Sequence, residues 1–91
     1  MMLNSLEKLI NLIRDRKKNS PENSYTKKLL DDRFLSVAKV KEEINELIEA
    51  VENKSNTVHE AADVLYHLAV YLEANNIKIE DVMVELEKRK K

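Results

Sequence analysis

The fold is decided by residues 58–72, which read VHEAADVLYHLAVYL. Nearly every side chain in this stretch is apolar, and the exceptions are His59, Glu60, Asp63 and His67. A helix that is apolar nearly all round is expected to be buried nearly all round. A chain of 91 residues can hardly surround such a helix by itself. We therefore expect a homodimer in which a second copy of the chain completes the core.

Helical spacing continues on both sides of this stretch. Apolar residues recur every three or four positions, as in Leu3, Leu6, Ile10 and Ile13. The helices predicted in this way cover residues 3–17, 25–30, 33–53, 58–74 and 80–90. The fold is therefore predicted to be all-α, a small bundle of about four to five helices in one domain, residues 1–91.

Polar residues mark the helix ends. Ser24 is predicted to cap the short second helix, and Asp31 or Asp32 the long third one. The segment 19–23 contains the single proline and is the clearest helix breaker. Asn75 and Asn76 are expected to end the helix 58–74, because asparagine tolerates the left-handed conformation that glycine usually adopts there.

Composition excludes several classes of protein. The chain has 16 Lys+Arg against 17 Asp+Glu, a formal charge of −1, so it lacks the basic surface of a nucleic-acid-binding protein. It has no cysteine and no glycine, which excludes thiolate metal sites, disulfides and glycine-rich phosphate loops. No apolar run approaches the roughly 20 residues of a membrane span, and the N-terminus does not resemble a signal peptide. We expect a cytoplasmic protein without nucleic-acid or membrane partners.

Two acidic faces point to a metal. On the helix 33–53, Glu43 and Glu46 flank an apolar stripe, and Glu42 lies further round toward solvent. On the buried helix, Glu60 and Asp63 share one face. The stripe consists of Val37, Val40, Ile44, Leu47 and Val51. Converging carboxylates repel one another, and Mg²⁺ or Mn²⁺ prefers such all-oxygen ligands.

Each acidic residue also has a purely structural interpretation. Glu43 could pair with Lys39 one turn earlier on the helix. Glu60 could close a capping box with Thr57, and Asp63 could pair with His67. His67 by itself is more often a hydrogen-bonded core residue than a ligand, and His59 is expected to be solvated at the start of its helix.

The acidic residues and the sequence segments around them resemble those of a known family. The pattern Glu42-Glu43-x-x-Glu46 followed by Glu60-x-x-Asp63 resembles the all-α, MazG-like nucleotide pyrophosphohydrolases. The stretches 21–30 (PENSYTKKLL), 39–43 (KVKEE) and 60–68 (EAADVLYHL) are similar to the phosphoribosyl-ATP pyrophosphohydrolases of histidine biosynthesis. That family usually has glycine before the Glu-Glu pair and after the short helix, where this chain has Lys41 and the run Asp31-Asp32-Arg33.

The resemblance implies Mg²⁺-dependent hydrolysis of phosphoribosyl-ATP to phosphoribosyl-AMP and pyrophosphate. Glu43, Glu46, Glu60 and Asp63 would hold the metal. Glu42 would support the ligands from outside, bind a second metal or accept the proton of the attacking water, and Glu46 is counted with it as catalytic. Further candidates, for binding the substrate, are Lys39, Ser24, Tyr25, Thr26, Lys28 and Arg33.

Two other functions stay open on the sequence alone. A MazG-like house-cleaning pyrophosphatase acting on (deoxy)nucleoside triphosphates would share the same acidic residues. A helical dimerisation module without enzymatic activity would carry them as a solvated face. The segments Ser24-Tyr25-Thr26 and Tyr66-His67 favour phosphoribosyl-ATP as the substrate.

Overall fold

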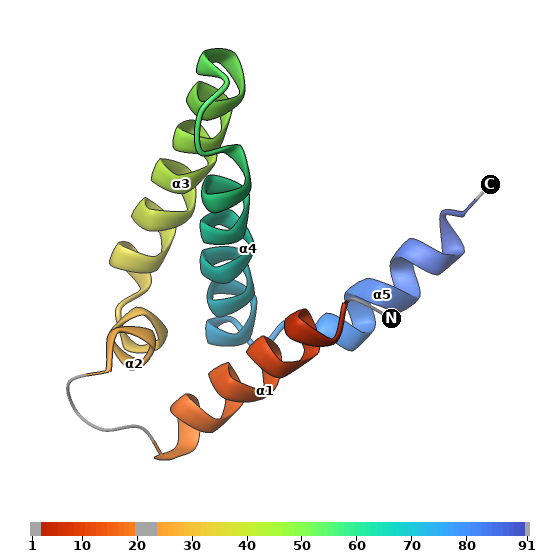
Figure 1. Ribbon diagram of the computed structural model, residues 1–91. Coiled ribbons are helices and arrows are strands. Elements are labelled where there is room, and N and C mark those ends of the chain that lie inside the picture. Colours follow the sequence, from red (N-terminus) through yellow and green to blue (C-terminus); the bar gives the residue numbers. More distant parts are fainter. Residues whose placement is uncertain (1–2, 20–23, 91) are drawn as a thin grey trace.

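The computed structural model describes residues 3–19 and 24–90, and its helices confirm the all-α prediction (Figure 1). No strand occurs in these ranges. The five helices are α1 (Asn4–Asn19), α2 (Tyr25–Asp31), α3 (Arg33–Asn53), α4 (Thr57–Ala74) and α5 (Ile79–Lys88). Each end lies within two residues of its predicted position. Residues 20–23 of the predicted breaker lie outside the described residues.

The helix ends are built as the polar residues predict. Ser24 accepts a hydrogen bond from the Lys27 backbone N–H at 3.3 Å, and Asp32, not Asp31, caps α3 by accepting from the Leu35 N–H at 3.0 Å. Asn76 follows α4 with a left-handed φ of 59°. These side chains satisfy backbone groups that a helix end leaves unpaired.

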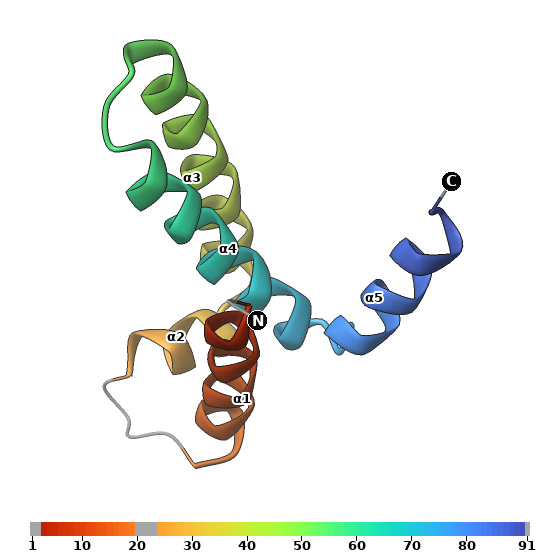
Figure 2. The same ribbon diagram turned by 45° about the vertical axis from the view of Figure 1, so that its right-hand side comes forward.

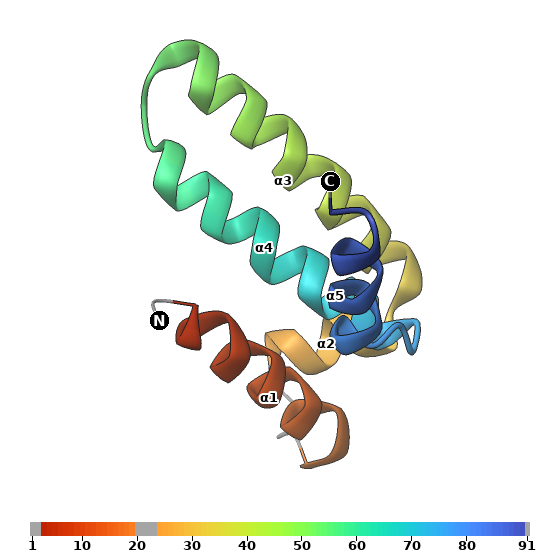
Figure 3. The same cartoon turned by 90° about the vertical axis from the view of Figure 1, so that its right-hand side faces the viewer.

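Helices α3 and α4 lie side by side as an antiparallel hairpin (Figure 3). The turn between them contains two left-handed residues, Lys54 (φ 54°) and Asn56 (φ 53°), although neither is glycine. Asparagine tolerates this conformation better than most residues do. The hairpin sets which residues of the two helices face each other, and it therefore positions the candidate site.

The core lies at the C-terminal half of α4, where α1 and α2 pack against the open end of the hairpin (Figure 2). Helix α4 contacts each of the four other helices. The buried apolar residues of this cluster are Ile10, Ile13, Leu29, Ala69 and Val70. The stretch 58–72 therefore contributes Ala69 and Val70 to the centre of the core.

In the single chain α4 is not buried all round, and its burial by a second copy of the chain stays a prediction. Val58 and Leu65 are 82% and 52% exposed. Helix α3 leaves part of its predicted stripe in solvent too, since Ile44 and Val51 are both exposed. The cause is the orientation of α3, whose buried residues are Ser36, Glu43 and Ala50, one every two turns. The seam between the long helices therefore contains a carboxylate, and apolar surface remains on the hairpin's flank.

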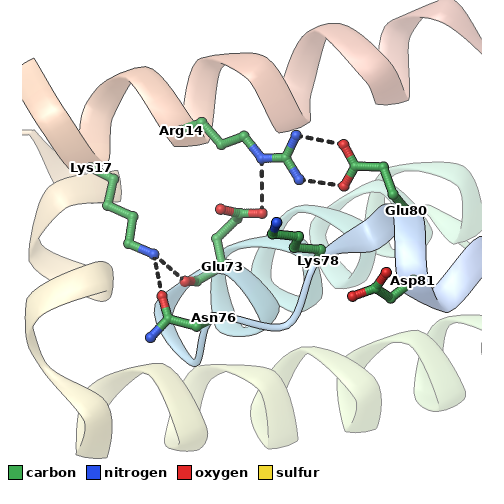
Figure 4. A pocket seen from close by; sticks show the side chains of 7 residues that line it. All are labelled: Arg14, Lys17, Glu73, Asn76, Lys78, Glu80 and Asp81. Carbon is green, nitrogen blue, oxygen red and sulfur yellow. Dashed lines mark hydrogen bonds and ion pairs between the residues drawn. The ribbon is translucent and has the colours of Figure 1, made fainter.

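Helix α5 leaves the end of α4 and is fastened to α1 by charges (Figure 4). Arg14 donates from Nε to the buried Glu73 carboxylate at 3.0 Å and from both terminal nitrogens to Glu80 at 2.9 and 2.6 Å. Lys17 donates to the Glu73 carbonyl and the Asn76 side chain. These residues line a cavity of about 480 Å³ that also includes Lys78 and Asp81.

Among the described helices, none is both long and apolar enough to cross a membrane.

Acid should weaken the attachment of α5 to α1. The hydrogen bonds from Arg14 lower the pKa of Glu80 to about 2, from its ordinary value of 4.5. A depressed carboxylate pKa adds stability that is fully present above pH 4.5 and is lost as the pH falls toward 2. We expect thermal melts followed by circular dichroism to show this loss in the wild type and much less of it in Glu80→Gln. Glu87→Gln, an exposed glutamate on the same helix, should retain the wild-type profile; equal profiles for all three proteins would contradict the assignment.

Candidate metal centre

The hairpin brings carboxylates of both long helices together. One oxygen each from Glu43, Glu46 and Glu60 lies within 4.8 Å of the other two. A second group, with one atom each from His59, Glu60 and Asp63, meets the same criterion. Glu60 belongs to both groups, so α3 and α4 share one continuous acidic cluster. Asp63, predicted beside the other three acids, is joined to them through Glu60.

Burial makes this cluster unusual. Glu43 is only 6% exposed, and one oxygen of Glu43 and one of Glu60 are buried without a hydrogen-bond partner among the described residues. Burial, together with the nearby Glu46 carboxylate, raises the pKa of Glu43, and burial with the charges of Glu46 and Asp63 raises the pKa of Glu60. Buried charges normally have a counter-charge or a hydrogen bond. Two such oxygens close together, without a partner among the described residues, make this cluster a candidate site for a cation.

The structural interpretations do not satisfy these oxygens. Lys39 reaches Glu43 at 3.7 Å, but it lies closer to the exposed Glu42, at 3.1 Å. The predicted capping box of Thr57 with Glu60 is wrong, because Asn56 is the N-cap residue and Thr57 is already helical. A single shared lysine cannot neutralise the cluster, and the carboxylate of Glu60 has no capping role.

The Asp63 side chain does not pair with His67, as one structural interpretation of the sequence proposed, but with His59. His67 contacts the backbone carbonyl oxygen of Asp63 at 2.9 Å, which leaves the Asp63 carboxylate free to face His59 at 3.3 Å. The imidazole of His59 is largely exposed, as predicted, and it also belongs to the second group of the acidic cluster. The i, i+4 spacing of His59 and Asp63 is the sequence signal that identifies this contact.

The ligand set fits a hard divalent cation. Oxygens that share one Mg²⁺ at about 2.1 Å lie no more than about 4.2 Å apart, and one oxygen from each of the three glutamates lies within 4.8 Å of the other two. The spacing of these carboxylates is therefore compatible with a shared ion. Beside the cluster, Glu46 and Glu60 also line a cavity of about 190 Å³ near the hairpin turn.

The predicted substrate-binding residues differ in their distance from the acidic cluster and in their contacts. Lys39 lies beside the acids, and the Tyr25 hydroxyl lies close enough to Lys39 and Glu43 for both to affect its pKa, which burial raises. Thr26 and Ser24 already have partners in the fold, the Tyr66 hydroxyl at 2.5 Å and the Lys27 N–H.

Arg33 and Lys28 are placed differently. Arg33 precedes Glu43 by ten residues on one helix, about 15 Å along the axis at 1.5 Å per residue. It lines a separate cavity of about 200 Å³ with Ser36 and Asn75. Lys28 is exposed on α2. The structure thus brings Lys39 and Tyr25 to the acids and keeps Arg33 away from them in the single chain.

Comparison with known proteins identifies the family of this chain. The family model described as phosphoribosyl-ATP pyrophosphohydrolase matches residues 6–90. A phosphoribosyl-ATP pyrophosphatase of Clostridium novyi (strain NT) is 43% identical over 91 residues, covering 94% of this chain and 81% of that protein. One from Sulfurisphaera tokodaii is 42% identical over 94 residues and covers both chains fully.

A longer protein contains a similar segment. The histidine biosynthesis trifunctional protein of Candida albicans is 42% identical over 82 residues, which are 90% of this chain and 10% of that protein. The family match thus spans nearly the whole chain and includes both helices of the acidic cluster. The chain belongs to the phosphoribosyl-ATP pyrophosphohydrolase family.

Proposed function

We propose that this protein hydrolyses phosphoribosyl-ATP to phosphoribosyl-AMP and pyrophosphate, the second step of histidine biosynthesis, in the cytoplasm. Water attacks one of the two phosphorus atoms of the α–β phosphoanhydride. The bond between that phosphorus and the bridging oxygen breaks, and pyrophosphate is released. The observation that carries the proposal is a pair of buried oxygens, on Glu43 and Glu60, that have no hydrogen-bond partner in the part of the chain that the structure describes. The relatives of this chain are named for this reaction.

We assign Glu43, Glu46, Glu60 and Asp63 as the residues that hold Mg²⁺, with Mn²⁺ as a substitute. When bound, the ion supplies the positive charge that lets an acidic site accept a triphosphate, and it polarises the phosphoanhydride. The burial of Glu43 keeps its carboxylate directed into the seam. Glu42, exposed and outside the three-glutamate group, is our candidate to accept the proton of the attacking water.

Binding of the substrate falls to the cations and hydroxyls around the acids. Lys39 is held by Glu42 and Glu43 at the edge of the cluster, where its ammonium group can contact a phosphate. Tyr25 lies beside it. We assign these two residues first, and Ser24, Thr26, Lys28 and Arg33 remain predictions for the outer part of the substrate.

We also propose a homodimer formed through the flank of the hairpin. The exposed apolar residues on α3 and α4 there are Ile44, Ile48, Val51, Leu65 and Leu68. Large exposed apolar patches are rare on monomeric proteins and often mark protein–protein interfaces. A second copy packed on this flank would bury it and complete the thin core of the single chain.

Removing a metal ligand should abolish turnover. We expect wild-type protein to release pyrophosphate from phosphoribosyl-ATP with Mg²⁺ and not with EDTA, and Glu46→Gln and Asp63→Asn to lower kcat at least about 100-fold, the equivalent of some 2.7 kcal/mol. Circular dichroism should show both variants folded.

Glu52→Gln, on an exposed part of α3, is the matched control and should retain normal kcat. Near-normal rates for Glu46→Gln would refute the ligand assignment. Faster release of pyrophosphate from a deoxynucleoside triphosphate than from phosphoribosyl-ATP would show that the proposed substrate is wrong.

Without metal, the acidic cluster should destabilise the protein at neutral pH. A carboxyl group with a raised pKa favours folding in its protonated form, so stability gained below about pH 4.5 is lost as the pH rises through the folded-state value. Glu43→Gln should therefore raise the metal-free melting temperature at pH 7 by about 4–8 °C for each 1 kcal/mol relieved, and less at pH 4.5.

Differential scanning calorimetry with and without Mg²⁺ gives the control for this measurement. Mg²⁺ should raise the melting temperature of the wild type and have little effect on Glu43→Gln. A Glu43→Gln protein less stable than metal-free wild type at pH 7 would show that Lys39 alone compensates the charge.

A charge placed on the apolar flank should dissociate the dimer. We expect light scattering after size exclusion to give a dimer for the wild type and a monomer for Leu65→Lys, because a lysine at the centre of an apolar interface loses its hydration. Val84→Lys, an equally exposed apolar position on α5, should stay dimeric. A monomeric wild type, or a dimeric Leu65→Lys, would contradict the proposal.

A further inference from the structure

His67 links two helices directly beside the acidic cluster. It lies on α4 and is only 7% exposed. Its Nδ1 is 2.9 Å from the backbone carbonyl oxygen of Asp63, and its Nε2 is 3.1 Å from the Tyr25 hydroxyl on α2. The imidazole therefore connects the backbone at one proposed metal ligand to the first residue of the short helix.

For a neutral imidazole, the two contacts fix where the protons lie. A carbonyl oxygen can only accept a hydrogen bond, so Nδ1 must carry a proton. In a neutral imidazole the other nitrogen is then an acceptor, and the Tyr25 hydroxyl donates to it. Tyrosine has one hydroxyl proton. With that proton given to His67, the Tyr25 oxygen presents only lone pairs toward the rest of the site.

Aromatic packing holds this arrangement in place. The rings of Tyr25 and Tyr66 are nearly parallel, with centroids 6.4 Å apart, and His67 meets both edge-on. The Tyr66 hydroxyl in turn shares a hydrogen bond with Thr26. Two links thus tie the first turn of α2 to α4, and the Tyr25 oxygen has a fixed direction although 46% of the residue is exposed.

Resting on the proposed function, we propose that Tyr25, positioned by His67, accepts a hydrogen bond from the nucleoside part of the substrate and does not bind its phosphates. Phosphate oxygens are themselves acceptors, so a tyrosine oxygen without a free proton has nothing to donate to them. Sugar hydroxyls and base N–H groups are donors. Lys39, whose ammonium group is close to Tyr25, then takes the anionic part of the ligand.

The tautomer can be tested on the intact protein without substrate. Imidazole ¹⁵N–¹H correlation spectra at pH 8 should show His67 protonated on Nδ1 and unprotonated on Nε2. In Tyr25→Phe the Nε2 resonance should shift, because its hydrogen bond is lost. A proton on Nε2 in the wild type would overturn the inference, whatever the substrate of the enzyme.

Kinetics test the contact itself. Tyr25→Phe should raise KM for phosphoribosyl-ATP about two- to tenfold, the loss of one hydrogen bond, while the inhibition constant of inorganic pyrophosphate stays within about twofold. His67→Gln, whose amide oxygen can accept from Tyr25, should lie closer to wild-type KM than His67→Leu, with circular dichroism confirming that all variants are folded.

Three outcomes would count against the inference. Parallel increases of KM and of the pyrophosphate inhibition constant would place Tyr25 on the phosphates, and an unchanged KM would remove it from the substrate. A wild-type protein with no turnover of phosphoribosyl-ATP would overturn the proposed function and this inference with it, and the wild-type assay by itself identifies that case.

Discussion

Repulsion among carboxylates confined between two antiparallel helices governs this structure. Like charges a few ångströms apart repel one another, and the repulsion grows as water is excluded from between them. Glu43, Glu46 and Glu60 present three such pairs, with one oxygen from each lying within 4.8 Å of the other two. The net stability of a small domain is only about 5–15 kcal/mol. The folded chain therefore either holds protons on this cluster, as the raised pKa values of Glu43 and Glu60 indicate, or holds a cation.

The rest of the fold keeps these side chains together. Helix α4 contacts all the other helices and carries the core at its C-terminal half and the acids at its N-terminal half. Core packing against α1 and α2 fixes α4, and the hairpin turn fixes α3 against it. Stability and chemistry are thus separated along one helix, so that the unfavourable charges lie away from the packed centre.

The apolar residues on the hairpin's flank are exposed because a carboxylate occupies the seam between the two long helices. Glu43 occupies the α3 seam that an apolar residue would otherwise fill, and neighbours such as Ile44 and Ile48 are turned outward. Placing a carboxylate in the seam costs hydrophobic burial within the chain. The proposed dimer would recover that burial on the flank without covering the seam with apolar side chains.

The sequence by itself determined the five helices, the cap at Ser24, a cap at Asp31 or Asp32, and the two carboxylate pairs, because these depend on helical periodicity and on contacts within a turn. Only the tertiary structure decided which atoms meet. Glu60 rather than Asp63 joins Glu43 and Glu46, Thr57 does not cap, Arg33 lies far from the acids, and His67 reaches Tyr25 across 42 positions. Such contacts depend on the register and crossing of packed helices, which side-chain packing along the whole interface sets and a local pattern does not encode.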